Sequence, residues 1–265
     1  MIDIAREVAR VRYPVMALST LAWGALAFGP GMHVEGLDVY CSATGSGTAT
    51  IAASPSLLLA LNPPSALAAG WALMLVAMMS PLIVPEIHHI RFTCLRSRRA
   101  RSIALFVAGY ACVWMMFGAV LASAELAYLA LAPESYIPAI VTGLATVVWQ
   151  ASPFKQRCLN GCHDNPPLRV FGLKADLDAL RFGWSRGVWC VGSCGWLMLF
   201  SLSLPAGHLM AMAAVAILVF CERLEDPEPP RWKMRGLGRA GRMTAARLRI
   251  RWRTVRRKLD LVLEQ

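Results

Sequence analysis

Residues 103–131 read IALFVAGYACVWMMFGAVLASAELAYLAL, a stretch of apolar and small residues that contains one charged side chain, Glu125. A helix that crosses the hydrocarbon core of a bilayer, which is about 30 Å thick, needs about 20 apolar residues. This stretch exceeds that length, so it can cross with some tilt. Lipid offers no hydrogen-bond partners to backbone groups, and we therefore expect a transmembrane α-helix here.

Composition extends this interpretation to the whole chain. Of the 265 residues, 57% are hydrophobic and 16% charged, whereas soluble domains carry about 25% charged residues. In a soluble protein, a net charge of +11 would suggest a nucleic-acid partner. Because this chain is so apolar, we instead expect an integral protein of the lipid bilayer and no nucleic-acid partner. We predict an all-α fold, a polytopic membrane helix bundle of about six transmembrane helices. The six stretches are roughly residues 13–30, 67–86, 103–131, 137–153, 187–204 and 206–221.

The lysines and arginines predict the orientation of this bundle. All 27 lie before the first span, between the second and third, between the fourth and fifth, or after the sixth. Basic residues favour the cytoplasmic side of a membrane. We therefore expect both termini in the cytoplasm, in a multi-pass protein of the inner (cytoplasmic) membrane whose long outer connection is 31–66.

The chain after the sixth span is a region of its own in this scheme. Prolines between residues 227 and 230 separate the transmembrane bundle, residues 1–224, from a basic cytoplasmic tail, residues 225–265. A basic amphipathic helix in such a tail typically lies on anionic lipid. Docking on a partner subunit and binding of RNA are the alternatives. The apolar face of the predicted tail helix consists of Leu248, Trp252, Val255, Leu259 and Val262.

Two pairs of cysteines share one spacing. Cys158 and Cys162 follow the fourth span, with His163 beside them, and Cys190 and Cys194 begin the fifth. Residues four apart share a helix face, and both pairs lie at the cytoplasmic ends of their spans, so we expect the four thiols to converge. Thiolates with a nearby imidazole suit Cu(I), Zn(II) or an iron–sulfur centre.

The alternative interpretation of these sulfur atoms is structural. A free cysteine also packs as a small hydrophobic residue, which is what we expect of Cys112 and Cys221. The same choice applies to Met74, Met78 and Met79 in the second span. Thioethers are soft ligands that select Cu(I), but buried methionines also serve simply to fill a core.

Few ionisable side chains lie in or beside the spans, where such groups are functional candidates by default. Glu222 ends the sixth span beside Arg223, and we expect it at a solvated helix end. Two further groups could supply metal ligands, or could be ordinary interfacial and loop residues. They are Glu86, His88 and His89 after the second span, and His33, Glu35, Asp38 and Cys41 in the outer connection.

Several motifs occur together in an order that is characteristic of one family. They are Trp71…Met74…Ala77-Met78-Met79-x-Pro81, Gly109-Tyr110 with Trp114, Gln150…Pro153-x-Lys155-x-x-Cys158-Leu159-x-x-Cys162, Cys190-Val191-Gly192-x-Cys194-x-Trp196-x-Met198 and Glu222. Over roughly residues 67–224 the chain resembles a bacterial family of predicted metal-binding integral membrane proteins, catalogued as a domain of unknown function. The resemblance implies a polytopic inner-membrane protein with a metal site. The chain departs from it at Ser193, where the family tends to have a cysteine, and at His163, where it has a basic residue.

These observations favour a membrane metal-handling protein, with copper as the first choice. Cys158, Cys162, Cys190 and Cys194, with His163, would bind Cu(I) or Zn(II) at the cytoplasmic face, and the three methionines would form a softer station within the membrane. The sequence has no Walker loop, so we expect binding and delivery by transport or by metallation of a membrane enzyme, and not catalysis. A metal client or another membrane subunit would be the partner. The alternatives are a non-catalytic accessory subunit of a larger membrane complex and a membrane thiol oxidoreductase.

Overall fold

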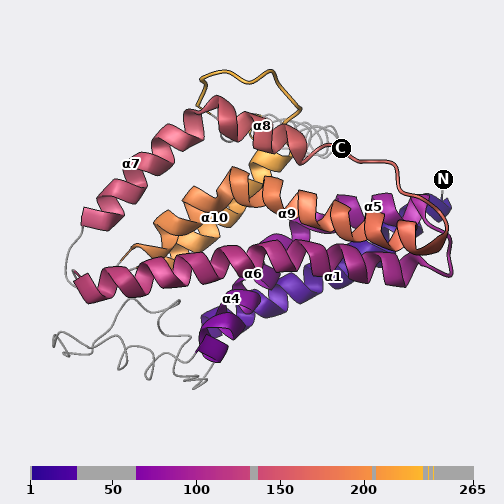
Figure 1. The fold of residues 1–265 in the computed structure, drawn as a ribbon, viewed down its shortest axis with the longest axis horizontal. Helices are drawn as coiled ribbons and strands as arrows, with labels where there is room; N and C mark the ends of the chain where they lie inside the picture. The colour runs from indigo at the N-terminus through magenta and orange to yellow at the C-terminus, as the bar shows by residue number, and fades with distance from the viewer. Residues whose placement is uncertain are drawn as a thin grey trace, which may run out of the picture.

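The computed structural model describes residues 2–28, 64–131, 137–204 and 207–234, together with residues 238 and 241. Within these ranges the chain forms helices and no strand (Figure 1), which confirms the all-α prediction. The elements in chain order are α1 (Ile2–Phe28), α4 (Pro64–Met79), the 3₁₀ segment η1 (Ser80–Ile83), α5 (Val84–Thr93), α6 (Arg99–Leu131), α7 (Ile137–Ala151), α8 (Pro153–Gly161), α9 (Gly172–Leu202) and α10 (His208–Arg223).

The predicted spans coincide with helices, but two of their boundaries differ from the structure. The fourth span ends with α7, because Ser152 adopts an extended backbone conformation and starts a separate helix, α8. The hydroxyl of Ser152 accepts a hydrogen bond from the backbone N–H of Lys155 at 3.2 Å, which is a helix N-cap. The fifth span is the second half of a longer helix, since α9 already begins at Gly172.

The second predicted span is a helix interrupted by prolines. Pro81 has no N–H to donate to the carbonyl of Ala77, one turn earlier, and the chain forms the short segment η1 between α4 and α5 at this point. The hydroxyl of Ser19 in α1 donates a hydrogen bond to that carbonyl at 2.6 Å. A buried carbonyl without a partner would be costly, so this bond both satisfies the kink and joins α1 to α4.

Two helical stretches are long and apolar enough to cross a membrane, Leu67–Thr93 and Arg99–Ala124. They correspond to the second and third predicted spans. Length and composition alone identify them, and a buried helix of a soluble protein can meet the same criteria. The six-span topology and the inner-membrane location therefore stay predictions.

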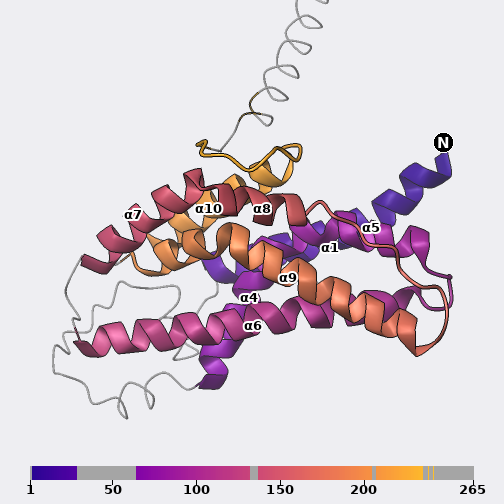
Figure 2. The same ribbon diagram turned by 45° about the horizontal axis from the view of Figure 1, so that its top comes forward.

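The most extensive packing joins α6 and α9, which run side by side in both ribbon views (Figures 1 and 2). Glycines make the approach close. A Cβ atom added at Gly187 would lie 2.9 Å from Cβ of Val113, and one at Gly109 would lie 3.0 Å from the backbone nitrogen of Trp184. Small residues four apart, such as Gly183 and Gly187, are typical of close helix contacts in membranes. This contact fixes α9, which carries the second cysteine pair.

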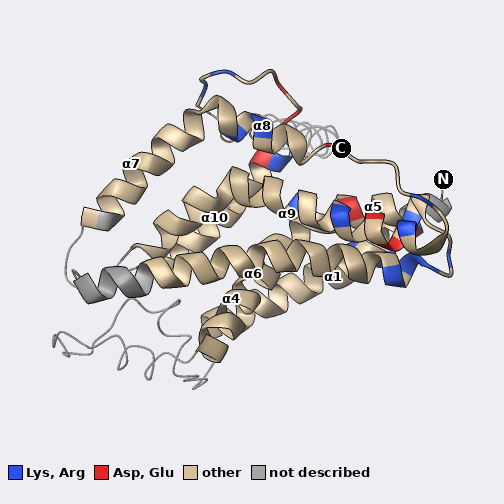
Figure 3. Ribbon diagram, in the orientation of Figure 1, with Lys and Arg blue, Asp and Glu red and all other residues tan. Residues whose placement is uncertain are grey.

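One group of charged residues lies on and beside α8, and a larger group gathers at the end of the bundle where the N-terminus lies (Figure 3). There Asp176 of α9 forms ion pairs of 2.7 Å with both Arg98 and Arg101 at the start of α6. Glu7 of α1 pairs with Arg91 of α5 at 2.5 Å. Three of the segments predicted to share the cytoplasmic side, namely the N-terminal segment, the connection between the second and third predicted spans and the first turns of α9, are joined by these ion pairs.

Candidate metal centre

Three of the four candidate thiols are buried in the interior. Cys190 and Cys194 are fully buried on α9, and Cys162, directly after α8, is buried as well. The thiols of Cys162 and Cys190 are close enough to interact electrostatically. The hydroxyl of Tyr110 in α6 donates a hydrogen bond to the sulfur of Cys190 at 3.2 Å, and the thiol of Cys194 donates to the carbonyl of Cys190 at 3.0 Å. We call Cys162, Cys190 and Cys194 the thiol site.

Glycines hold α8 against α9 at this level. A Cβ atom at Gly161 would lie 2.6 Å from the indole ring of Trp189. Gly192 faces Cys158 in the same way, since a Cβ atom there would lie 2.6 Å from the sulfur of Cys158. Cys158 is therefore half-buried against Gly192, on another side of α9 from the inward-facing pair. Burial raises the pKa of the Cys158 thiol, and the charge of nearby Lys155 opposes the rise.

Three buried charged side chains surround the thiol site, and we call Glu86, Arg186 and Arg223 the charged cluster. An oxygen of Glu86 lies 3.3 Å from Nε of Arg186 and 3.7 Å from Nη1 of Arg223. Arg223 also donates to the backbone carbonyl of Cys162 at 3.3 Å. Arg186 donates to three oxygens in the turn after α8, namely the carbonyls of Gly161 at 3.2 Å and Asp164 at 2.6 Å and the side chain of Asn165 at 3.1 Å.

The charges of this region act on one another. Burial raises the pKa of the Cys162 thiol to about 12, with Arg223 and Arg186 opposing the rise and Cys190 adding to it. Burial works against the charge of Arg223, but the thiols of Cys162 and Cys190 and the carboxylate of Glu86 favour it, and the pKa of Arg223 is raised as a result. Arg223 is therefore a permanent cation beside the thiols.

Glu222 is not at a solvated helix end, so the expectation for it was wrong. It forms an ion pair of 2.8 Å with Lys155, and the two side chains are 1% and 0% exposed. The amide nitrogen of Gln150 donates to the carboxylate of Glu222, and the amide oxygen of Gln150 accepts a hydrogen bond from Lys155 at 2.5 Å. Because α8 packs over the end of α10, a lysine and a glutamate 67 residues apart in the chain neutralise each other in the interior.

The candidate methionines belong to the same core. Met74, Met78 and Met79 are buried, and they join one hydrophobic cluster with Cys190 and Cys194. Two further methionines are fully buried in that cluster, Met198 one turn beyond Cys194 and Met212 on α10. Core packing accounts for all five, and a thioether station for Cu(I) stays a prediction.

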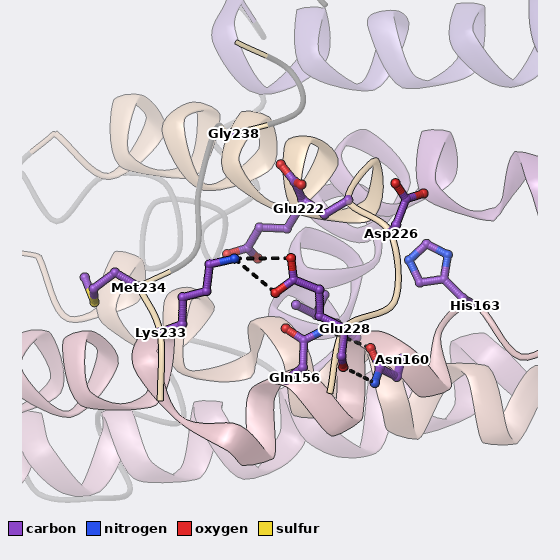
Figure 4. A pocket seen from close by; sticks show the side chains of 11 residues that line it. Gln156, Asn160, His163, Glu222, Asp226, Glu228, Lys233, Met234 and Gly238 are labelled. Carbon is purple, nitrogen blue, oxygen red and sulfur yellow. Dashed lines mark hydrogen bonds and ion pairs between the residues drawn. The ribbon is translucent and has the colours of Figure 1, made fainter. Parts of the chain in front are cut away.

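His163 lies at a cavity of about 270 Å³ between α8, the end of α10 and the chain that follows α10 (Figure 4). That chain is held over α8, because Asn160 donates to the carbonyl of Glu228 at 2.8 Å. The figure shows His163 beside Asp226 on the wall of this cavity. The cavity carries several acidic side chains: Glu222, Glu225, Asp226 and Glu228.

The remaining candidates have the following places. Glu86 belongs to the charged cluster, and His89 lies 3.1 Å from the carbonyl oxygen of Pro166 through Nε2. Cys221 is buried as expected, but Cys112 is exposed on α6, where packing in the protein core was expected. Three predictions lie outside the described residues: the outer-loop group of His33, Glu35, Asp38 and Cys41, the side chain of Glu125, and the tail helix with Leu248, Trp252, Val255, Leu259 and Val262.

Across the described ranges, no three His, Cys, Asp or Glu side chains are arranged so that together they could hold a metal ion. A structural zinc site needs four such ligands. The donors that the interior does bring together are the soft sulfur atoms of Cys162, Cys190 and Cys194, which favour Cu(I) over harder cations. The donor chemistry therefore fits Cu(I) as a cargo better than Zn(II) as a resident ion.

Comparison with known proteins supports the same metal. The sequence matches the family described as PpoB2, copper chaperone, over residues 68–242. The chain belongs to this copper chaperone family. No curated protein and no solved structure matches it. Membership confirms that the chain is related to copper handling, as the resemblance to a metal-binding family implied.

The region matched by the copper chaperone family contains both cysteine pairs, the three methionines and the charged cluster. Sequence reasoning missed Arg186 and Arg223 as parts of the candidate site, because it counted every arginine as a topology signal. Tyr110 and Lys155 occur in the family-like motifs, but nothing in their spacing shows which partners they contact. The sequence position of Arg223 carries no distinguishing signal, since arginines commonly follow the cytoplasmic end of an apolar span.

Proposed function

We propose that this protein is a membrane-embedded copper chaperone that accepts Cu(I) at the thiol site and passes it to a client protein. The observation that carries the proposal is the burial of Cys162, Cys190 and Cys194, with Cys162 near enough to Cys190 to interact electrostatically, in a chain of a copper chaperone family. Thiolates bind Cu(I) strongly, and metal binding displaces their protons.

Delivery needs a direction and a recipient. The predicted topology puts the thiol site at the cytoplasmic ends of the fourth and fifth spans, so Cu(I) would enter from the cytoplasm. Met74, Met78 and Met79 would provide softer ligands deeper in the bundle. Without a nucleotide-binding motif in the sequence, transfer would run downhill to a metal client, such as a membrane enzyme that is being metallated.

The test uses full-length protein purified in detergent under reducing conditions. Competition with a chromophoric Cu(I) chelator measures the stoichiometry and affinity, and we expect one equivalent of Cu(I). The Cys162→Ser and Cys190→Ser variants should lose this equivalent, whereas Cys112→Ser, whose thiol is exposed on α6, should keep it. Wild-type protein that binds no Cu(I), or thiol-site variants that bind it like the wild type, would contradict the proposal.

The alternative, an accessory subunit whose cysteines only pack, predicts a different result in the same preparation. The protein would then be free of copper after reconstitution with Cu(I), and it would co-purify in stoichiometric amounts with other membrane subunits.

A further inference from the structure

The charged cluster has one positive charge in excess. Arg186 and Arg223 are cations and Glu86 is a single anion, with side chains that are 1%, 9% and 4% exposed. The second buried ion pair of this region, Lys155 with Glu222, is balanced in itself. A buried charge without a counterion is costly, so the excess needs an anion, and the thiols of Cys162 and Cys190 are the groups that can supply one as thiolates.

Arg223 is the member that holds the excess. Arg186 has oxygen partners on α5 and on the turn after α8. The oxygen partners of Arg223 are reached through Nη1 alone, namely the carbonyl of Cys162 and Glu86, and the guanidinium also lies close enough to Cys190 to act as a donor to its sulfur. Its Nε and Nη2 atoms are buried and have no hydrogen-bond partner. Two N–H groups of a permanent cation thus have no oxygen acceptor, and the thiols of Cys162 and Cys190 are the groups that favour its charge from this side.

The charge of a metal complex at these thiols depends on the metal. Two thiolates with Cu(I) carry one net negative charge, whereas two thiolates with Zn(II) are neutral. Of these two complexes of Cys162 and Cys190, only the one with Cu(I) cancels the excess charge of the cluster. We infer that Arg223 is the counterion of the Cu(I) bis-thiolate formed by Cys162 and Cys190, and that it makes this site prefer a monovalent over a divalent ion. The inference rests on the proposed function and adds the residue that sets the metal preference.

Arg223 is a positioning residue in this scheme and does not itself bind the metal. Groups that support metal ligands in this way typically contribute about 10–100-fold to metal affinity. We expect Arg223→Gln to weaken Cu(I) binding by that factor and to leave Zn(II) binding unchanged or stronger. Arg223→Lys keeps the charge and should keep most of the preference for Cu(I). Arg231→Gln, a matched change at an arginine that is 61% exposed, should alter neither affinity.

A double variant separates charge from shape. Glu86→Gln combined with Arg223→Gln removes one charge of each sign, so Arg186 again leaves one positive charge in excess. This variant should recover Cu(I) affinity relative to Arg223→Gln alone. It also keeps the inference testable if the single variant does not fold.

The measurements are Cu(I) and Zn(II) affinities of detergent-purified, full-length variants by competition with chelators, with circular dichroism and gel filtration as checks of folding. Equal losses of Cu(I) and Zn(II) affinity in Arg223→Gln, or no recovery in the double variant, would overturn the inference. So would Arg223→Gln with wild-type affinities for both metals, while the wild type still bound Cu(I) through its cysteines. Absence of Cu(I) binding by the wild type would instead overturn the proposed function.

Discussion

The buried pair of Lys155 and Glu222 gives the strongest test of how the thiol site is supported. Each side chain is within 1% of complete burial, and their nearest charged atoms lie 2.8 Å apart. Removing one partner of such a pair leaves a buried charge without a counterion, which costs about 3–5 kcal/mol. For a protein of this size, 1 kcal/mol shifts the midpoint of thermal unfolding by about 2–4 °C. We therefore expect Lys155→Met and Glu222→Gln each to lower the midpoint by about 6–20 °C.

The double variant should behave differently from the sum of its parts. Replacing both partners of a buried pair by uncharged groups is often neutral or stabilising, because the cost of removing two charges from water disappears with them. We expect the midpoint of Lys155→Met/Glu222→Gln to lie above those of both single variants. The assay is thermal unfolding of detergent-purified protein, followed by circular dichroism.

The control is Glu228→Gln, at a carboxylate that pairs with Lys233 and Arg231 but is 41% exposed. Exposed pairs contribute about 0–1 kcal/mol, so this variant should unfold close to the wild type. Single variants at Lys155 and Glu222 that unfold within 2 °C of the wild type would refute the burial of the pair. Strictly additive effects would refute its coupling.

Three further predictions concern the surroundings of the site. Gly161→Ala would force a methyl group against the indole of Trp189, 2.6 Å away, and overpacking of this kind costs about 1–3 kcal/mol. As the control, Gly24→Ala meets no atom within 4 Å and should stabilise its helix by about 0.5–1 kcal/mol. Thermal unfolding measures both effects. The pKa of Cys162 is raised to about 12, and the thiolate is the reactive form of cysteine. The rate at which maleimide labels Cys162, measured by peptide mass spectrometry, should therefore rise about tenfold per pH unit between pH 7 and 10. A plateau of this rate by pH 9 would contradict the prediction. Ser19→Ala removes a buried hydrogen bond of 2.6 Å to α4 and should cost about 1–3 kcal/mol, whereas an unfolding midpoint equal to that of the wild type would show that water or another group replaces the hydroxyl.

Helices were predictable from the sequence because their signal is local. A run of apolar residues such as 103–131 contains its own evidence, and α6 covers it completely. The early start of α9 was not predictable in this way. Its first half carries charged residues such as Lys174 and Asp176, which resemble a cytoplasmic connection, yet Asp176 is paired with arginines of α6. Contacts with another helix decide the structure there, and a hydropathy pattern does not contain them.

The candidate site was predictable in part for the same reason. Two cysteine pairs at equal depth predicted a shared site, and the structure buries Cys162, Cys190 and Cys194 in the interior, while the shared metal site itself stays a prediction. The i,i+4 rule then suggested that Cys158 would join them, but that rule assumes an unbroken helix with one face towards the partner. Here α8 is short, Cys162 lies just beyond its end, and Gly192 provides a separate place for the sulfur of Cys158.

The charged cluster shows why the thiols and the arginines have to be considered together. Two buried guanidinium groups are costly in a core of sulfur atoms and aromatic rings, and each has at least one N–H group without a hydrogen-bond partner. On our proposal, a cargo that forms an anionic complex with Cys162 and Cys190 offsets that cost while it is bound, so the bound state gains stability over the metal-free state. The same excess charge gives a neutral or divalent-ion complex no such gain. On our proposal, one feature of the interior, the position of Arg223, therefore links the stability of the fold to the presence of copper and to the choice of metal.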